Sequence, residues 1–147
     1  MEIIMAIKQL AVFVENKHGS LDEITAMLAN AGVDIRALSI SETQDFGILR
    51  MIVSDLDAAK ATLKANECVY TVTDVVGVSV PDTPGAMAGV IRILSENDIN
   101  LEYVYAFLGA SHASACVILR VADNERTEKL LEEGGYHVVA DPFIEKL

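Results

Sequence analysis

The sequence predicts an α+β fold made of two ferredoxin-like βαββαβ units, each an antiparallel four-stranded sheet with two helices on one face. The chain has 147 residues, which allows one ordinary domain or two small ones. Apolar residues alternate in some runs, as in strands, and recur at helical spacing in others. The deciding observation is that this pattern occurs twice along the chain.

The repeat becomes visible when residues 11–35 are aligned with residues 77–101, an offset of 66 that places Gly19 on Gly85. Two residues are gained in the next hairpin, and the offset becomes 68, where VSDLDAAKATL matches VADNERTEKLL. The identity is low, but the hydrophobic pattern is kept from end to end. The expected domains are therefore residues 1–73, the N-terminal unit, and residues 74–147, the C-terminal unit.

Periodicity assigns the elements within each unit. In the N-terminal unit we expect strands at 6–14, 33–41, 47–53 and 68–72, and helices at 20–30 and 56–65. In the C-terminal unit we expect strands at 75–80, 100–108, 114–121 and 137–140, and helices at 85–96 and 124–133. Gly32 is placed to end its helix, SETQDFG and ASHAS are expected hairpin loops, and Asp74 is nearly the only candidate linker residue.

A unit of roughly 70 residues buries little surface alone, and its sheet keeps one bare face and open edges. The run LEYVYAFL is apolar on both alternating faces, whereas GILRMIV places Arg50 on one face. We therefore expect another unit to cover part of the bare face and the two units to be rigidly coupled. We also expect two chains to associate as a homodimer or a larger assembly.

The charge balance excludes two classes of partner. The chain carries 22 acidic and 11 basic residues, a formal net charge of −11. Neither half has a basic patch that would neutralise phosphates, so nucleic-acid binding is not expected. Repulsion from anionic headgroups argues against binding to a membrane surface.

The N-terminal run MEIIMAIKQLAVFV is expected to be a strand rather than a targeting segment. Glu2 and Lys8 interrupt it, and no basic region precedes it. Cys68 and Cys116 each lie in an apolar run without CxxC spacing. Buried free thiols in a reducing compartment are the favoured interpretation, so we expect a cytoplasmic protein.

The stretch PDTPGAM leaves a predicted strand and enters a predicted helix. We expect Asp82 or Thr83 to cap this helix, with Pro84 in its first position. The amides from Gly85 onward then lack intrahelical partners, which suits a carboxylate or phosphate. Taken alone, the loop is better explained as a capped helix start that binds only water.

The wider pattern changes this interpretation. A strand, a D-x-P-G-x-h-x-x-h helix start and a helix that ends in DINL before the next strand resemble the ACT domain. That family is a small βαββαβ module that senses amino acids and other small metabolites. The resemblance covers essentially the whole chain twice, as a tandem ACT protein without an attached enzyme. It implies a ligand at an interface between two units.

The resemblance implies contacts from the loop after the first strand of a unit and from the segment between its first helix and second strand. In the C-terminal unit the matching residues are Asp82, Thr83, Pro84, Gly85, Ala86, Met87, Asn100 and Leu101. In the N-terminal unit they are Asn16, Lys17, His18, Gly19, Ser20, Leu21, Asp34 and Ile35.

An α-amino acid fits these positions. Helix-terminal amides would take its carboxylate, Asn100 or Asp34 with strand carbonyls its ammonium, and Met87 its side chain. In the N-terminal unit NKHG replaces D-x-P-G, which leaves open whether this site is occupied. Lys17 and His18 would aid an anion there, but a solvated loop is the simpler explanation for His18.

No motif for catalysis or metal binding is found. His18, His112 and His137 lie far apart without ligand spacing, and no GxSxG, P-loop, dinucleotide fingerprint or CxxC occurs. Ser111 and His112 are expected to have a surface role, and EKLLEEGG to be a solvated face. We expect no cofactor, and an enzyme on a ferredoxin-like scaffold ranks last among the hypotheses.

The sequence therefore favours a non-catalytic regulatory protein that binds a small metabolite, an amino acid above others, at interfaces between ACT units. Ligand binding would stabilise one arrangement of units, and a regulated enzyme or another partner would sense this allosteric change. The alternative is a ligand-free oligomerisation or interaction module, in which the helix-start loops are structural only.

Overall fold

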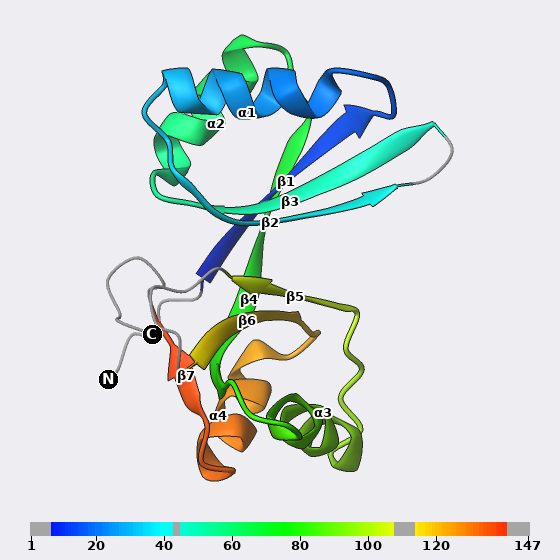
Figure 1. The fold of residues 1–147 in the computed structure, drawn as a ribbon, viewed down its shortest axis with the longest axis vertical. Helices are drawn as coiled ribbons and strands as arrows, with labels where there is room; N and C mark the ends of the chain where they lie inside the picture. Colours follow the sequence, from blue (N-terminus) through cyan, green and yellow to red (C-terminus); the bar gives the residue numbers. More distant parts are fainter. Residues whose placement is uncertain (1–6, 43–44, 108–113, 141–147) are drawn as a thin grey trace. The chain divides into compact units, whose positions relative to one another are not determined.

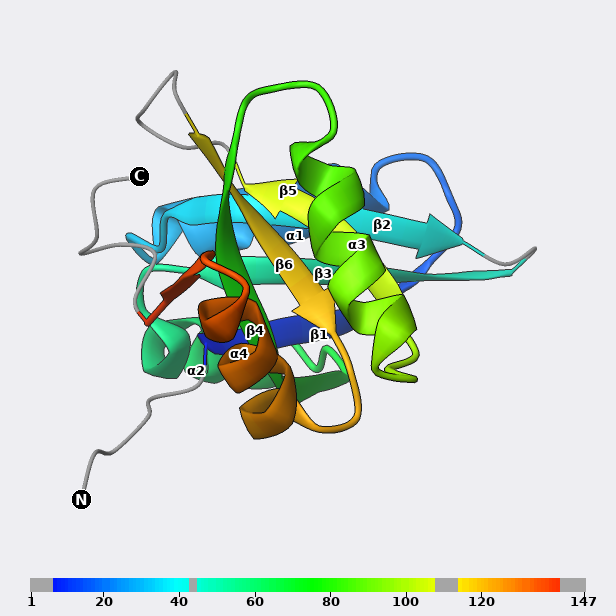
Figure 2. The same ribbon diagram turned by 90° about the horizontal axis from the view of Figure 1, so that it is seen from below.

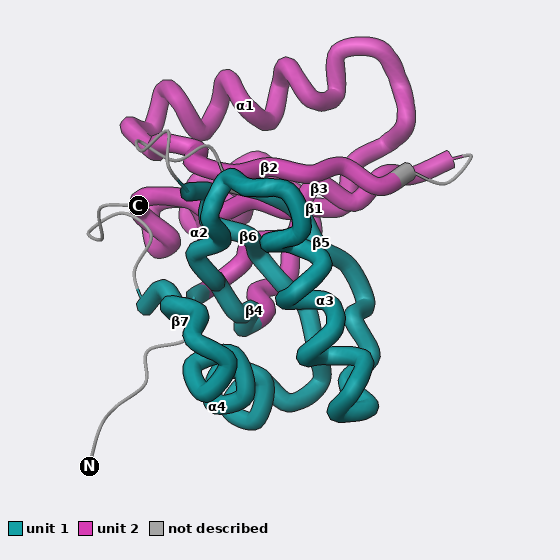
Figure 3. Tube along the Cα trace, turned by 60° about the horizontal axis from the view of Figure 1, so that its bottom comes forward, with its two compact units in different colours: residues 1–7, 74–147 teal, residues 8–73 magenta. Residues whose placement is uncertain are grey.

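The computed structural model describes residues 7–42, 45–107 and 114–140. The chain divides into two compact units, which are described separately (Figure 3). The N-terminal unit contains residues 8–73, and the described part of the C-terminal unit contains Ile7 and residues 74–107 and 114–140. Ser111 and His112 of the predicted ASHAS loop lie outside the described residues, as do positions 43–44 of SETQDFG.

The N-terminal unit is an antiparallel sheet with two helices on one face (Figure 1). Its elements are β1 (Ile7–Glu15), α1 (Ser20–Asn30), β2 (Ile35–Glu42), β3 (Phe46–Val53), α2 (Leu56–Ala65) and the first part of β4 (Tyr70–Pro81). β1 pairs with β3, and β3 pairs with β2. On the other side of β1, the Phe13 amide donates to the Val69 carbonyl at 2.9 Å, so the strand order is β2-β3-β1-β4.

Alternation along the strands decides which face the helices cover. Leu10, Val12 and Val14 of β1 are buried on one face, together with Leu49 and Met51 of β3. The helices supply the opposite side of this core at a spacing of four residues. Their buried residues are Ile24 and Leu28 of α1 and Ala59 and Leu63 of α2.

The C-terminal unit repeats this architecture, with α3 and α4 on one face of its sheet (Figure 2). Its elements are the second part of β4, α3 (Ala86–Glu96), β5 (Tyr103–Phe107), β6 (Ser114–Arg120), α4 (Asn124–Glu133) and β7 (His137–Val139). The strand order is β5-β6-β4-β7, which is equivalent to that of the N-terminal unit. The predicted fold class, two ferredoxin-like βαββαβ units, is confirmed.

The helix bounds agree closely with the predictions, whereas β2, β4 and β5 begin later than predicted. α1, α2 and α4 have the predicted ends, and α3 begins at 86 rather than 85. β2 begins at 35 rather than 33, and β5 begins at 103 rather than 100. The reason is that the amides of Val33 and Ile99 still donate to carbonyls in the preceding helix, at 3.0 and 2.9 Å. Helix-ending turns therefore occupy residues that were expected to be extended.

The prediction of separate strands at 68–72 and 75–80 is wrong. One strand, β4, runs from Tyr70 to Pro81, so the described residues contain seven strands rather than eight. Asp74, predicted as a linker residue, lies within this strand. The segment TVTDVV is rich in β-branched residues and has no glycine or proline, so nothing in it interrupts the extended conformation.

The helix ends show the repeat in backbone detail. Each helix is followed by one residue with positive φ: Gly32 (78°), Glu67 (58°), Asp98 (56°) and Gly135 (90°). The offsets of 66 and 68 pair Gly32 with Asp98 and Glu67 with Gly135. Because left-handed backbone favours glycine, one position of each pair holds a side chain at a conformational cost.

We expect Glu67→Gly to raise the free energy of unfolding by about 0.5–1 kcal/mol, because glycine adopts positive φ without steric penalty. Lys64→Gly is the matched control, since Lys64 lies within α2, where glycine is unfavourable. Urea unfolding measures the free energy of unfolding of both variants. The same destabilisation in both would contradict the assignment of strain to Glu67.

α4 carries a buried carboxyl group. Glu128 is 8% exposed, whereas its counterpart 68 positions earlier is Lys60. Burial, with Glu132 and Glu125 nearby, raises the pKa of Glu128 above its ordinary value of 4.5. A carboxyl group with a higher pKa in the folded state destabilises the fold when it is ionised. This penalty applies above the folded-state pKa and disappears as the pH falls below 4.5.

Glu128→Gln should therefore raise the melting temperature at neutral pH, because the neutral amide avoids burial of a charge. The gain over the wild type should shrink as the pH is lowered through the folded-state pKa. Glu125→Gln, which changes an exposed residue of the same helix, is the control and should have a smaller effect. A gain from Glu128→Gln that does not depend on pH would argue against this explanation.

Candidate functional site

The loops that enter α1 and α3 have the same backbone structure. In the first, the Lys17 amide donates to the Glu15 carbonyl at 2.9 Å, and the Ser20 amide donates to the Lys17 carbonyl at 3.3 Å. In the second, the equivalent bonds join Thr83 to Pro81 at 2.9 Å and Ala86 to Thr83 at 3.2 Å. Thus NKHG keeps the backbone of D-x-P-G although it lacks the proline and the acid.

The predicted cap of α3 is wrong. Gly85, rather than Asp82 or Thr83, is the N-cap, and no side chain caps the helix. Pro84 precedes the cap instead of occupying the first helical position. The loop requires left-handed backbone just before the helix, at φ 87° for Gly85 and φ 89° for Gly19. Glycine takes that position and has no side chain with which to cap.

Both helix starts leave amides available to a ligand. The first i→i−4 hydrogen bond of α1 runs from the Glu23 amide to the Gly19 carbonyl. That of α3 runs from the Gly89 amide to the Gly85 carbonyl, and both measure 3.0 Å. The amides of residues 21–22 and 87–88 precede these bonds and have no intrahelical acceptor. Such amides carry partial positive charge and suit an anion.

The two helix starts differ in charge. The first turn of α1 contains Asp22 and Glu23, whereas the first turn of α3 contains no acidic residue. Lys17 forms an ion pair with Glu15, with Nζ and Oε2 separated by 3.3 Å. His18 is exposed in the same loop. A carboxylate is therefore repelled at α1 and accommodated better at α3.

The structure separates the two predicted parts of the site within each unit. Gly85 lies at the start of α3, and Asn100 lies beyond its end. α3 has 11 residues, which corresponds to about 16 Å at 1.5 Å per residue. The same holds for Gly19 and Asp34 across α1, which also has 11 residues. One small ligand cannot contact both parts of a single unit.

The predicted residues differ in accessibility. Asp82 to Gly85 and Asn100 are exposed, while Ala86, Met87 and Leu101 are partly buried against the core of the C-terminal unit. In the N-terminal unit Asn16, Leu21 and Asp34 are exposed, and Ile35 packs against the core. The Asp34 amide donates to Ser54 Oγ at 2.9 Å, which holds this segment against the end of β3.

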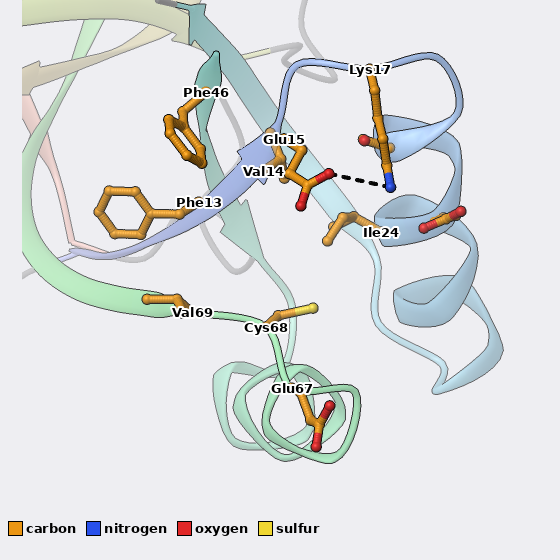
Figure 4. A pocket seen from close by; sticks show the side chains of 11 residues that line it. Phe13, Val14, Glu15, Lys17, Ile24, Phe46, Glu67, Cys68 and Val69 are labelled. Carbon is orange, nitrogen blue, oxygen red and sulfur yellow. Dashed lines mark ion pairs between the residues drawn. The ribbon is translucent and has the colours of Figure 1, made fainter.

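The N-terminal unit also contains a pocket of about 310 Å³, whose lining includes Lys17 and Ser20 of the predicted site (Figure 4). It lies where β1 ends, beside the first turns of α1 and the turn from α2 into β4. Its lining combines aromatic, aliphatic, thiol and charged groups from several elements. The lining residues are Phe13, Val14, Glu15, Lys17, Ser20, Glu23, Ile24, Phe46, Glu67, Cys68 and Val69.

The pocket does not contain an activated nucleophile. Burial, with Glu23 nearby, raises the pKa of the Cys68 thiol, so the thiolate is disfavoured at neutral pH. Cys68 is half-buried rather than buried as expected, while Cys116 is buried. Neither Cys68 nor Cys116 forms a disulfide.

In the C-terminal unit Tyr136 lines the corresponding pocket, which has a volume of about 300 Å³. This residue is the counterpart of Cys68 at the offset of 68, and its hydroxyl donates to the Ala86 carbonyl at 3.3 Å. A Cβ atom added at Gly89 would overlap Tyr136 Oη. Gly89, the counterpart of Glu23, therefore leaves the room that the phenol occupies.

The described residues contain neither a metal-binding cluster nor a helix that could span a membrane. No group of three or more His, Cys, Asp or Glu side chains there is arranged to hold a metal ion. His112 lies outside those residues. None of the helices in the described ranges is long and apolar enough to cross a membrane.

Comparisons with known proteins add the following findings. A family model described as an ACT domain pair matches residues 5–147. The crystal structure of protein BT0572 from Bacteroides thetaiotaomicron is 42% identical, with a TM-score of 0.88, and covers 97% of this chain and 98% of that chain. No curated protein matches the chain.

The chain is also similar to a regulatory subunit of aspartate kinase from two organisms. For the ligand-free subunit from Thermus thermophilus the identity is 14% and the TM-score 0.65, over 90% of this chain and 95% of that chain. For the subunit from Thermus flavus the identity is 14% and the TM-score 0.59, over 89% of this chain and 94% of that chain. At this identity the likeness concerns the fold alone.

Because Tyr136 and Gly89 share one space, we expect their substitutions to be coupled. Gly89→Ala should lower the free energy of unfolding in the wild type by about 1–2 kcal/mol, since the phenol must move and loses its hydrogen bond. In a Tyr136→Phe background the same change should be neutral or stabilising, because alanine favours a helix over glycine by about 1 kcal/mol. Chemical unfolding of the four proteins measures the coupling. An equal effect of Gly89→Ala in both backgrounds would exclude this contact.

Proposed function

The chain belongs to the family of ACT domain pairs, and on this premise we propose that it is a non-catalytic regulatory protein that binds an amino acid at the start of α3. The family match confirms the resemblance predicted from the residue pattern. The fold is one that also occurs in regulatory subunits of aspartate kinase. Cys68 and Cys116 are not joined in a disulfide, which is compatible with the reducing cytoplasm in which we place the protein.

The observation that carries the proposal is the uncapped start of α3. The amides of Met87 and Ala88 precede the first bond of the helix register, and no acidic side chain lies in the first turn. A carboxylate bound there would accept hydrogen bonds from these amides and interact favourably with the helix dipole. The exposed Gly85 lets a ligand approach the backbone closely.

The contacts to the rest of the ligand must come from a second unit. Asn100 lies about 16 Å from Gly85 along α3 of the same unit, by the 11 residues of this helix. We propose that Asn100 and Leu101 of another unit complete the site, with the Asn100 side-chain oxygen accepting a hydrogen bond from the ammonium group. Two chains would then form a homodimer whose interface contains the ligand.

The charge of the chain supports a zwitterionic ligand. At a net charge of −11, long-range repulsion opposes anions but not a ligand without net charge. Met87 is partly buried beside the helix start and offers an apolar contact to the ligand side chain. The corresponding loop of the N-terminal unit is less suitable because Asp22 and Glu23 follow it.

A regulatory role follows if the ligand binds one assembly state better than another. The equilibrium then shifts by the difference in affinity, and a partner enzyme that contacts only one state senses the shift. Two of the structures named above are regulatory subunits of aspartate kinase. The partner proposed here is an enzyme whose activity responds to the bound amino acid.

The N-terminal unit provides the test substitution. Asp22 and Ala88 are equivalent at the offset of 66, and Ala88 is exposed. Ala88→Asp should weaken binding of the amino acid about tenfold or more, because its carboxylate competes for the same amides. The acid itself favours the helix start, so the fold should be kept or slightly stabilised.

Calorimetry and thermal shift with the twenty amino acids first identify the ligand for the wild type. Asp22→Ala, which removes the same charge from α1, is the matched control and should leave this affinity unchanged. Unchanged binding by folded Ala88→Asp would contradict the site. If no amino acid raises the melting temperature of the wild type or binds to it in calorimetry, a ligand-free interaction module becomes the better hypothesis.

A further inference from the structure

We infer that a pocket on the sheet of the C-terminal unit is a second binding site, which takes a small molecule through an oxyanion group, a carboxylate or a phosphate. The pocket has a volume of about 300 Å³, at the lower end of ligand pockets, which hold roughly 300–1,000 Å³. Neither the loop at 82–87 nor the segment at 100–101 contributes a lining residue. The lining residues are Ser79, Pro81, Ser114, Gly135, Tyr136 and His137.

Strand alternation places the pocket on the sheet face opposite to α3 and α4. Val78 and Val80 of β4 are buried in the core that these two helices cover. Successive side chains of a strand point to opposite faces, so Ser79 and Pro81 point away from the helices. The pocket is therefore on the other side of the sheet from the amides at the start of α3.

The pairing of three strands brings the polar side chains together. Ser79 of β4 lies directly opposite His137 of β7, and Pro81 of β4 lies directly opposite Ser114 of β6. Side chains directly opposite each other in an antiparallel pair lie on the same face, with Cβ atoms about 4.5–5.5 Å apart. Two hydroxyl groups and one imidazole thus surround the same space.

The side chains in this space are hydrogen-bond donors. The hydroxyls of Ser79 and Ser114 and the imidazole of His137 each offer an O–H or N–H group. Tyr136 packs on the helix side, where its hydroxyl donates to the Ala86 carbonyl at 3.3 Å. Among the residues that the structure describes, no aspartate or glutamate lines the pocket. Hydrogen bonds to an ionised acceptor are about twice as strong as neutral ones, so this set favours an oxyanion.

The N-terminal unit has different chemistry at the same places. Three donors of the C-terminal unit correspond to apolar residues, and two uncharged residues correspond to glutamates. At the offsets of 66 and 68 the pairs are Phe13 and Ser79, Phe46 and Ser114, Val69 and His137, Glu15 and Pro81, and Glu67 and Gly135. All five residues of the N-terminal unit line its own pocket. Each difference favours an oxyanion in the C-terminal unit, because this unit has more donors and fewer negative charges.

The chain as a whole opposes an anion at long range. Its net charge is −11, so the summed field repels an approaching oxyanion. At an ionic strength of about 0.15 M the Debye length is about 8 Å, and exposed charges farther away are largely screened. Local hydrogen bonds then decide the affinity, so binding is measured at this ionic strength.

The test uses the full chain with inorganic phosphate and acetate as probes, and binding is followed by backbone amide NMR. We expect at least one of the two anions to shift the amides of Ser79, Ser114 and His137 in a saturable way, but not those of Phe13 and Val69. Tighter binding of phosphate assigns the site to phosphate-bearing ligands, and tighter binding of acetate assigns it to carboxylates. Methylammonium, a small cation, is the control and should cause no shift at these residues.

Three variants test the lining residues. Ser79→Ala combined with His137→Val removes two of the donors and should weaken binding of the preferred anion about tenfold or more. Pro81→Glu adds the carboxylate that the N-terminal unit has at Glu15, and it should have a similar effect. Ala122→Glu is the matched control, because it adds the same charge at an exposed residue beyond the other end of β6. Thermal unfolding followed by circular dichroism verifies that the variants are folded.

The inference is overturned if neither phosphate nor acetate shifts the amides of the pocket, or if methylammonium shifts them as strongly. It is equally overturned if the folded variant with Ser79→Ala and His137→Val binds the anion as tightly as the wild type. The same holds if Pro81→Glu weakens binding no more than Ala122→Glu. The proposed amino-acid site is tested separately, because Ala88→Asp leaves the lining of this pocket unchanged and should not alter anion binding there.

Discussion

Each unit depends on one central strand whose alternate aliphatic side chains must be covered by helices. β1 and the second part of β4 have neighbours on both sides, and their buried residues form the middle of each core. The chain must therefore leave the strand and return as a helix over one face. Gly19 and Gly85 make that reversal possible with left-handed backbone, and the same geometry leaves the helix starts without side-chain caps. The candidate ligand site is thus a consequence of how the core is covered.

Much of this architecture can be predicted from the sequence because the repeat tests each assignment twice. The helix ends of α1, α2 and α4 follow from local signals, such as the spacing of apolar residues, that both units share. The continuity of β4 was missed because Asp74 is rare in strands, although its β-branched neighbours decide the conformation. The cap of α3 was misassigned because Asp82 and Thr83 are good capping residues in isolation, while the loop geometry requires glycine at the cap.

The pocket of the N-terminal unit could be predicted only in part. Lys17 and Ser20 belong to the predicted loop, whereas the other lining residues come from β1, α1, β3 and the turn before β4 and have no spacing that marks a site. The signal that does exist is a difference in side-chain volume at matched positions, Cys68 against Tyr136. That difference has meaning only when the fold shows that the two positions enclose the same space. The two units have equivalent strand orders and helix ends but different side chains at these positions.

The contact between Gly89 and Tyr136 also constrains how such a divergence can proceed. Glutamate in place of glycine overlaps the tyrosine hydroxyl, so a unit with both bulky residues cannot pack in this way. A unit with glycine and cysteine is free of that overlap, although it contains an empty space. If glycine and tyrosine are changed to glutamate and cysteine one residue at a time, the tyrosine must therefore be replaced before the glycine. The two units of this chain, with glutamate and cysteine in one and glycine and tyrosine in the other, each hold a combination that avoids this overlap.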